Sequence, residues 1–445
     1  MAGSAPFHRC SILLACGAIA SGLAAQDRRY DPQAGIDPDG RIERPVLPEG
    51  LPNPKRWRYI PEGRIVPGNP IDRLFQTSFI APQLFAEPDI GVGFGVAFTD
   101  IDFRNQRRQE FAGIFLSYTT EGQQRYRAIW RRFTNHIELP QGGVLQDERA
   151  FWQGGVGYEK TLTRRFYGFG ADTTSGAETS YTDEVTAASV SRQFTLDGDA
   201  GDWIAGLGTV AEFHNLAGGR VSEVPSTEQV FPGTVADGDS QGLLWLNAGL
   251  QYNTRDSLHS PYRGVTVGAG VSLVPLQSSG DVGGRYRASA TWVVPVWAPF
   301  HDGGRGKEEN PPTDTLAFGA FTTGTFGDLP FYALPSLGGP NTLRGYINDR
   351  FTDRAAWHAS AEYRFWFVPR GFRITDRIRI ERVGAAVFYD VGSVADDWSE
   401  SFSSTVRDSY GIGLRVHLER LALFRVDFGF SDEDTNFTIN YGLPF

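Results

Sequence analysis

Cysteine is almost missing from this sequence: Cys10 and Cys16 are the only two in 445 residues. Both belong to an N-terminal segment that we expect to be removed, so the mature chain would contain no cysteine. Neither a disulfide framework nor thiol chemistry is therefore expected.

Long apolar runs are also missing. Ser11–Ala25 is the one sustained run, and it is shorter than the about 18 apolar residues that a membrane-spanning helix needs. It follows Arg9 and ends in small residues, which is typical of a secretory signal peptide. We expect residues 1–25 to be this signal peptide. A lipoprotein signal ending at Cys16 is the alternative, although the apolar stretch continues past that residue.

Basic runs and catalytic patterns are absent as well. The net charge is −10, and no cluster of Lys and Arg suggests a nucleic-acid surface. There is no Gly-x-Ser-x-Gly elbow, and the seven histidines are scattered singly without metal-ligand spacing. We therefore expect no enzymatic activity, no metal, no cofactor and no nucleic-acid partner.

The C-terminal segment TNFTINYGLPF, residues 435–445, alternates between large apolar and small or polar residues. Such alternation predicts a strand with one apolar face that continues to the last residue. Five large apolar side chains are rarely left at a chain end in water, so this face is expected to contact lipid. The apolar residues are Phe437, Ile439, Tyr441, Leu443 and Phe445.

The same alternation recurs along the chain from Ile90 onward. It defines about sixteen segments, each as long as a tilted strand that crosses a bilayer. The first begins near Ile90, and separate segments begin near Arg149 and Arg165. We predict an all-β fold, a 16-stranded antiparallel transmembrane β-barrel at residues 81–445. A secreted β-sandwich or propeller is the alternative, but its strands would be shorter and its repeats recognisable.

Residues 26–80 precede this region and are rich in proline, with neither the helical nor the strand period. They are expected to form an extended, poorly structured periplasmic lead-in.

Two stretches indicate a family. LPSLGGPNTLRGYINDRF (334–351) lies between predicted strands 11 and 12, and YNTRDSLHSPYRG (252–264) lies at an earlier turn. With AEYRF (361–365) and FYDVGSV (388–394), they resemble the bacterial surface-antigen barrel family, which includes the BamA and TamA assembly proteins and the two-partner secretion transporters. The matching loop residues are Leu343, Arg344, Gly345 and Tyr346, and the matching turn residues are Arg255, Asp256, Pro261 and Gly264. Asn253 replaces the usual Asp of the turn, and Asn caps turns as Asp does.

The resemblance implies that the long loop folds back into the lumen, where Arg344 meets carboxylates of the inner wall. Strand parity supports this independently, because Glu362 and Asp390 both fall on the inward faces of their strands. Two such carboxylates can hold one guanidinium in a bidentate pair. The alternative is a solvated loop arginine beside two ordinary lumen acids.

The resemblance also implies a bacterial outer-membrane protein that aids insertion or transport of protein or lipid. Its partners would be outer-membrane lipid and either client proteins or a separate periplasmic partner, and we expect a monomeric barrel. The lead-in is too short for the POTRA domains that usually receive clients in this family. A passive or plugged channel for small solutes is the alternative function, and a barrel enzyme or adhesin is the weakest.

The seam between the first and last strands is predicted to be weak. Gly91, Gly93 and Gly95 lie on the inward face of the first predicted strand, and Pro444 has no N–H to give to the sheet. Such a seam could open sideways, although the glycines could instead make room for the folded loop. The alternating last strand that ends in an aromatic residue also resembles the assembly signal of outer-membrane proteins, formed here by Phe437, Ile439, Tyr441, Leu443 and Phe445.

Overall fold

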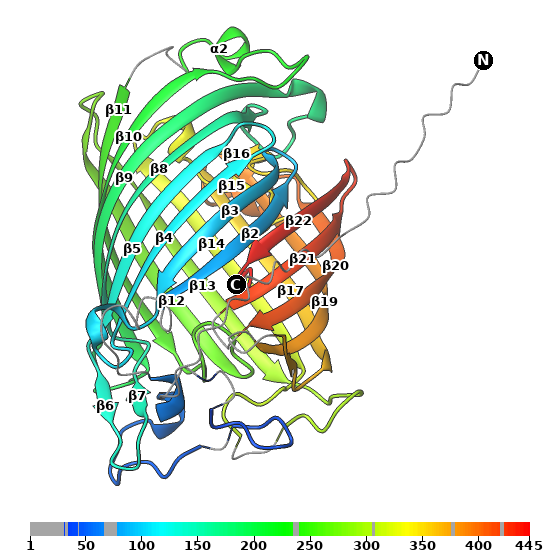
Figure 1. Ribbon diagram of the computed structural model, residues 1–445. Coiled ribbons are helices and arrows are strands. Elements are labelled where there is room, and N and C mark those ends of the chain that lie inside the picture. The colour runs from blue at the N-terminus through cyan, green and yellow to red at the C-terminus, as the bar shows by residue number, and fades with distance from the viewer. Residues whose placement is uncertain are drawn as a thin grey trace.

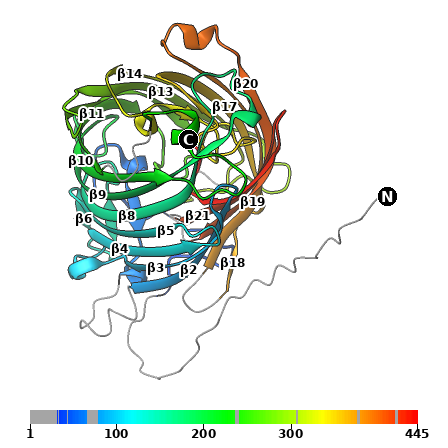
Figure 2. The same cartoon turned by 90° about the horizontal axis from the view of Figure 1, so that it is seen from above.

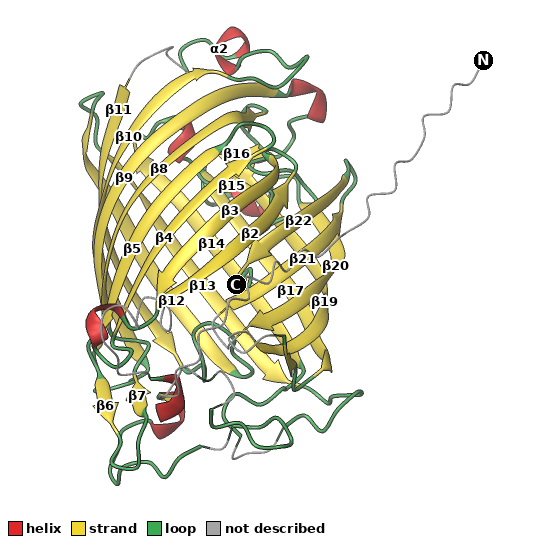
Figure 3. Cartoon of the chain, in the orientation of Figure 1, coloured by secondary structure: helices red, strands yellow, loops and turns green. Residues whose placement is uncertain are grey.

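The computed structural model describes residues 31, 34–42, 44–65, 78–234, 240–304, 308–374, 379–418 and 422–445. The predicted signal peptide, residues 1–25, lies outside these residues. Most of the described chain belongs to one barrel of tilted strands (Figures 1 and 3).

Sixteen long strands of the described residues close this barrel, each antiparallel to its neighbours. In sheet order they are β2 (Ser78–Glu87), β3 (Gly91–Asp100), β4 (Glu110–Thr119), β5 (Gln124–Phe133), β8 (Phe151–Phe166), β9 (Thr179–Thr195), β10 (Trp203–Gly218), β11 (Ser240–Asn253), β12 (Gly264–Gln277), β13 (Gly283–Pro295), β14 (Thr315–Gly327), β17 (Ala355–Val368), β19 (Arg379–Ala395), β20 (Arg407–Leu418), β21 (Ala422–Phe430) and β22 (Thr435–Tyr441). The predicted strand number and closed antiparallel architecture are thus confirmed.

Side chains alternate between the outside and the lumen, as the sequence pattern predicts. Along β13, Tyr286 and Trp292 are exposed on the outer face, whereas Arg285 and Arg287 take the opposite parity. Large apolar side chains on the outer face fit a lipid environment.

Two predicted strand assignments are wrong: one strand is missed and another is divided in two. The two errors cancel, so the total number of strands is still correct. The first strand is β2 rather than the segment near Ile90, which is the second strand, β3. Leu84 and Phe85 of β2 are consecutive large apolar residues and Pro82 is unusual inside a strand, so this stretch shows no simple alternation. The segments near Arg149 and Arg165 are one strand, β8, in which a register shift between Thr161 and Arg164 breaks the period.

The connections divide between two rims. We call the rim at the bottom of Figure 1 the near rim; it carries the lead-in and the β5–β8 connection. The opposite rim, the far rim, carries α2 (Thr227–Val230) and the β14–β17 connection. The remaining short strands are β1 (Arg58–Ile60), β6 (His136–Glu138), β7 (Val144–Gln146), β15 (Ser336–Leu337), β16 (Phe351–Thr352) and β18 (Phe372–Arg373). The 3-10 turns are Pro54–Arg56, Glu62–Arg64, Phe103–Asn105, Ser175–Ala177, Phe331–Ala333 and Glu400–Phe402. No helix in the described part of the chain has the length and apolar character needed to span a bilayer.

The lead-in is not poorly structured over its described residues, contrary to expectation. Its strand β1 pairs with β7, and β7 pairs with β6, so that lead-in and β5–β8 connection form one small sheet. Trp57 is buried at 2% exposure against Leu139 and Leu145. Arg44 Nε reaches Glu309 Oε2, at 2.7 Å, in the connection between β13 and β14. The partner strand of β1, β7, lies far away in the sequence, so local periodicity could not reveal this pairing.

Truncation of Trp57 should detach the lead-in without unfolding the barrel. Removal of a buried Trp side chain costs about 3–5 kcal/mol in a protein core. We expect Trp57→Ala to raise the rate of tryptic cleavage at neighbouring Lys55 and Arg56 by at least about tenfold. Val46→Ala is the matched control, since Val46 is 87% exposed. Equal cleavage rates for both variants would contradict the packed lead-in.

Candidate functional site

The long β14–β17 connection is anchored by apolar packing before any charge is considered. β15 pairs with β16 through Ser336 with Thr352 and Leu337 with Phe351, which closes the base of the connection. Leu343 is fully buried in one cluster with Leu337 and Phe351. This packing presents the next residue, Arg344, to the wall made by β17 and β19.

Arg344 binds two carboxylates of that wall. Its Nε and Nη2 donate to Asp390 at 2.9 and 2.8 Å, a bidentate pair. Its Nη1 donates to Glu362 Oε2 at 2.6 Å. The guanidinium carbon also lies 3.4 Å from the centroid of the Phe388 ring. All three charged groups are buried, so the charges compensate one another away from water.

Two glycines allow the loop to come this close. A Cβ at Gly345 would meet the Phe430 carbonyl at 2.6 Å, and a Cβ at Gly429 would meet the Arg344 carbonyl at 2.2 Å. Both contacts are with backbone, which cannot move aside easily. Gly345 was singled out from the sequence, whereas Gly429 was not.

Sequence reasoning missed most of the charge network around Glu362. Arg364 Nε donates to Glu362 at 2.8 Å, and Arg415 Nη2 lies 3.3 Å from the same carboxylate. Arg415 also pairs with Asp427 at 2.6 Å, and Arg425 reaches Asp427 at 3.3 Å. Inward parity was the available signal, but it cannot say which inward residues meet across the lumen.

The same connection contacts both strands that flank the seam. On one side, Asn348 donates its backbone N–H to Asp89 at 3.2 Å and its side-chain amide to Glu87 at 2.8 Å. On the other side, Arg350 forms two 2.6 Å hydrogen bonds with Glu433. Tyr346 completes this second contact: Asn436 of β22 donates to its carbonyl at 2.8 Å.

Asp89 makes its contact with Asn348 sensitive to pH. Burial raises the pKa of Asp89 to about 7, with Asp349 and Glu87 adding to the rise and Arg165 opposing it. The unfolded chain has an ordinary aspartate pKa, so the folded state binds more protons between about pH 4 and pH 7. The contribution of Asp89 to stability therefore falls as the pH rises through this window.

We expect the thermal unfolding midpoint in detergent to fall between about pH 5 and pH 8 in the wild type, and to fall less in Asp89→Asn. Glu121→Gln, at an exposed carboxylate of a neighbouring turn, is the control and should keep the wild-type slope. Identical slopes in the wild type and Asp89→Asn would show that Asp89 does not titrate in this range.

The turn motif forms a compact connection between β11 and β12. Asp256 Oδ1 accepts the backbone N–H groups of Tyr262 and Arg263, both at 3.2 Å, and Asn253 Oδ1 accepts from the Arg255 backbone at 3.1 Å. Gly264 has a φ of 117°, and a Cβ there would meet the Arg255 backbone at 2.5 Å. Pro261 lines a small cavity together with Leu443 and Phe445. The motif and the C-terminal residues thus line the same cavity.

The predicted seam is one strand away from its actual position. Gly91, Gly93 and Gly95 lie in β3, whose partners are β2 and β4, and not at the junction of first and last strands. A Cβ at Gly93 would meet the Phe85 ring of β2 at 2.2 Å, so this glycine makes room for a neighbouring side chain. The seam itself joins β2 to β22, with Ala86 opposite Ile439.

The C-terminal strand is shorter than predicted. β22 ends at Tyr441, and Phe437 and Tyr441 are exposed on its outer face as expected. Gly442 has a φ of 80°, and the chain then turns inward. Phe445 packs on Gly319 of β14 and lies 5.2 Å from the Arg364 guanidinium, so Leu443, Pro444 and Phe445 do not belong to the seam or to the outer face. Figure 2 places the C-terminal end within the ring of strands.

No group of three or more His, Cys, Asp or Glu side chains that could hold a metal ion occurs among the described residues. The site is an arrangement of ion pairs and packed loops rather than a set of metal ligands.

Comparison with known proteins agrees with this geometry. A family model described as the Omp85 superfamily domain matches residues 68–445. A search of curated proteins returned no significant match. Among solved structures, BamA from Haemophilus ducreyi lacking POTRA domains 1–3 is similar with a TM-score of 0.51 and 15% identity, covering 82% of this chain and 70% of that one. CdiB from Escherichia coli is similar with a TM-score of 0.53 and 11% identity, covering 87% and 67%.

At these identities the two structures support the fold alone, whereas the family model spans most of the chain. The resemblance to surface-antigen barrels is thereby confirmed, together with an outer-membrane location and a non-enzymatic role. The chain belongs to the Omp85 superfamily of bacterial outer-membrane β-barrels.

Proposed function

We propose that this barrel opens sideways between β2 and β22 to insert or translocate client polypeptide. The observation that carries the proposal is the seam: within the described residues, its register consists of Ala86 opposite Ile439, whereas β22 pairs with β21 at every position from Thr435 to Tyr441. A backbone hydrogen bond contributes about 0.5–1.5 kcal/mol net. The β2–β22 junction is therefore the least costly place to open the sheet.

An opened seam would not remain empty. Unpaired backbone groups are very unfavourable in hydrocarbon, so the free edges of β2 and β22 would favour pairing with another strand. An extended client segment could supply that strand by β-augmentation. The proposed client is therefore a polypeptide that can adopt a β-strand.

We further propose that the β14–β17 connection folds into the lumen and acts as a latch on the seam. The Arg344 pairs with Glu362 and Asp390 support the inward position. Contacts of Asn348 with Asp89 and of Arg350 with Glu433 support the latch, because these partners lie at the ends of opposite seam strands. Opening would then require the connection to release at least one side.

Other partners follow from the same arrangement. Exposed aromatic and aliphatic side chains on the outer face, such as Trp292 and Phe437, are in contact with membrane lipid. The proposed opening requires only a monomeric barrel, because both strands of the seam belong to the same chain. Client polypeptides, or a periplasmic partner that delivers them to the near rim, are the remaining expected partners.

A plugged channel for small solutes is the second candidate, and a lumen cavity of about 1080 Å³ favours it. Depletion of the protein, followed by quantitative profiling of outer-membrane proteins, separates the two. Loss of specific barrels from the outer membrane is expected if clients are inserted. An unchanged profile with altered solute uptake would favour the channel.

A further inference from the structure

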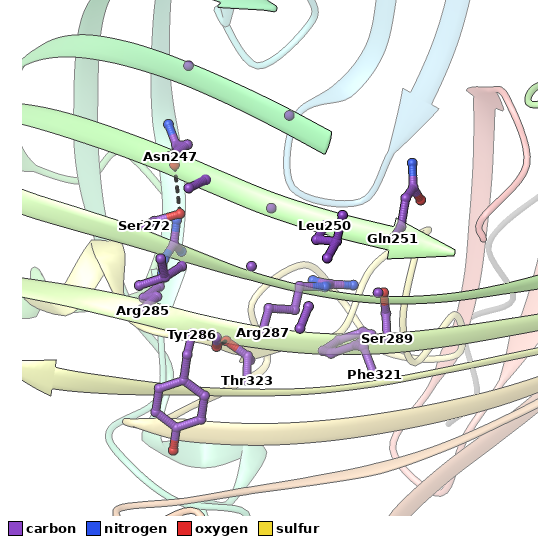
Figure 4. Close-up of a pocket in the computed structure, with 18 of the residues that line it drawn as sticks. Asn247, Leu250, Gln251, Ser272, Arg285, Tyr286, Arg287, Ser289, Phe321 and Thr323 are labelled. Atoms are coloured by element: carbon purple, nitrogen blue, oxygen red, sulfur yellow. Dashed lines mark hydrogen bonds between the residues drawn. The ribbon is translucent and has the colours of Figure 1, made fainter. Parts of the chain in front are cut away.

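The lumen is divided into two unlike halves. One half, toward β17–β22, holds the buried network of Arg344, Glu362 and Asp390 with its neighbours. The other half, enclosed by β9–β14, contains the cavity of about 1080 Å³. Figure 4 shows part of this cavity wall, with side chains from several neighbouring strands.

The side chains that line this cavity carry positive charge and no negative charge. Its lining includes Arg255, Arg285 and Arg287, but no Asp or Glu among the described residues. The lining also includes Arg192, but this residue has outward parity together with Trp152, on which it stacks at 4.8 Å. A cation-lined cavity in a chain with a net charge of −10 is a local reversal of the overall charge.

Arg287 is the arginine most available to a ligand. It is exposed, and its guanidinium carbon lies 3.9 Å from the centroid of the Phe321 ring. No carboxylate lies within ion-pair distance of it in the described structure. Its five N–H donors are therefore open to an acceptor from solution.

Arg285 lies two residues before Arg287 on the same face of β13. Residues two apart on a strand are about 6.8 Å apart, so both guanidinium groups can approach one multivalent anion. Arg285 stacks at 4.7 Å on Trp245 and donates to the Ala333 carbonyl at 3.3 Å. Trp245 in turn donates to Glu212 of β10 at 2.7 Å, so this carboxylate already has a hydrogen-bond partner.

The rest of the wall offers neutral hydrogen-bonding groups and space. Figure 4 shows Gln251, Asn247 and Ser272 on strands beside Arg285 and Arg287, with Ser272 bonded to Asn247 at 2.6 Å. Inward glycines widen the cavity next to them; Gly206 has no atom within 4 Å of where a Cβ would be. Guanidinium groups beside amides and hydroxyls suit phosphate and carboxylate oxygens.

We propose that the β9–β14 half of the lumen is a binding site for small multivalent anions with phosphate or carboxylate groups, with Arg287 and Arg285 as the binding residues. A low-dielectric wall of one charge also raises the local concentration of such anions. The site is independent of the seam, so it can exist whether or not the barrel opens sideways.

Titration calorimetry on the intact barrel in detergent, at low ionic strength, tests this with inorganic pyrophosphate and, separately, citrate. Saturable binding to the wild type is expected, and Arg287→Gln should weaken it by about tenfold or more. Arg192→Gln is the matched control, because this arginine faces outward, and it should bind as the wild type does. Tighter binding of pyrophosphate than citrate would identify phosphate as the preferred group.

Arg287 is exposed, so its substitution is not expected to disturb folding, and an unchanged thermal midpoint of Arg287→Gln verifies this. Added salt should weaken binding to the wild type by screening. Absence of binding of either anion to the wild type, or equal affinities of Arg287→Gln and Arg192→Gln, would overturn the proposal.

Discussion

A disulfide between Ala86→Cys and Ile439→Cys is expected to abolish the function of the barrel while leaving its fold intact. These residues are directly opposed across the β2–β22 seam. Opposed residues of antiparallel strands have Cα atoms about 4.5–5.5 Å apart, which suits a disulfide. The expected mature chain has no other cysteine, so the introduced pair has no competing partner.

The readout is complementation of a depleted strain, scored by the outer-membrane protein profile with and without reductant. The oxidised variant should fail, and reduction should restore the profile. Ala269→Cys with Ala288→Cys is the matched control, since these residues are opposed in the continuous β12–β13 ladder. A locked seam that supports a normal profile would exclude lateral opening and favour the solute channel.

Replacement of Arg344 by Glu is expected to have the largest effect on stability. The change removes the partner of Asp390 and one of the three arginine partners of Glu362, and it adds a third carboxylate beside them in a buried place. Breaking a buried ion pair costs about 3–5 kcal/mol, and the added repulsion increases this cost. We expect a lower unfolding midpoint in urea, lower abundance in the outer membrane and, if the loop leaves the lumen, a larger conductance in planar bilayers.

Arg354→Glu is the matched control from the same connection. Arg354 is half exposed and lies 3.7 Å from Asp396, which is itself exposed. Surface ion pairs are worth about 0–1 kcal/mol, so this variant should behave nearly as the wild type does. Equal behaviour of the two variants in all three measurements would show that the Arg344 pairs do not hold the loop.

Periodicity alone was sufficient for the barrel. Side chains alternate along each long strand, so the apolar outer face could be recognised without any knowledge of strand partners. The same parity assigned Glu362 and Asp390 to inward faces, because it depends only on position within one strand. The two misassigned boundaries lie where alternation fails, at Leu84 and Phe85 of β2 and at the register shift of β8.

The Arg-Gly-Tyr motif of the long connection was recognisable because it is local, but its surroundings were not. Arg364, Arg415 and Asp427 join the network from three different strands. Their meeting depends on how the barrel closes and how far each side chain reaches across it. The pairs Glu362–Arg364 and Arg425–Asp427 are exceptions, because each lies within one strand at a spacing of two residues.

The sequence by itself therefore determined the fold class, the strand number and the inward or outward direction of most side chains, all of which follow from local geometry. Only the tertiary structure decided that β2 and β22 form the seam, that Trp57 of the lead-in packs on the near rim, and that Phe445 turns inward to Gly319. Each of these results is a contact between segments far apart in the chain. Such contacts are selected by packing and hydrogen bonding in the closed barrel, and not by the preferences of neighbouring residues.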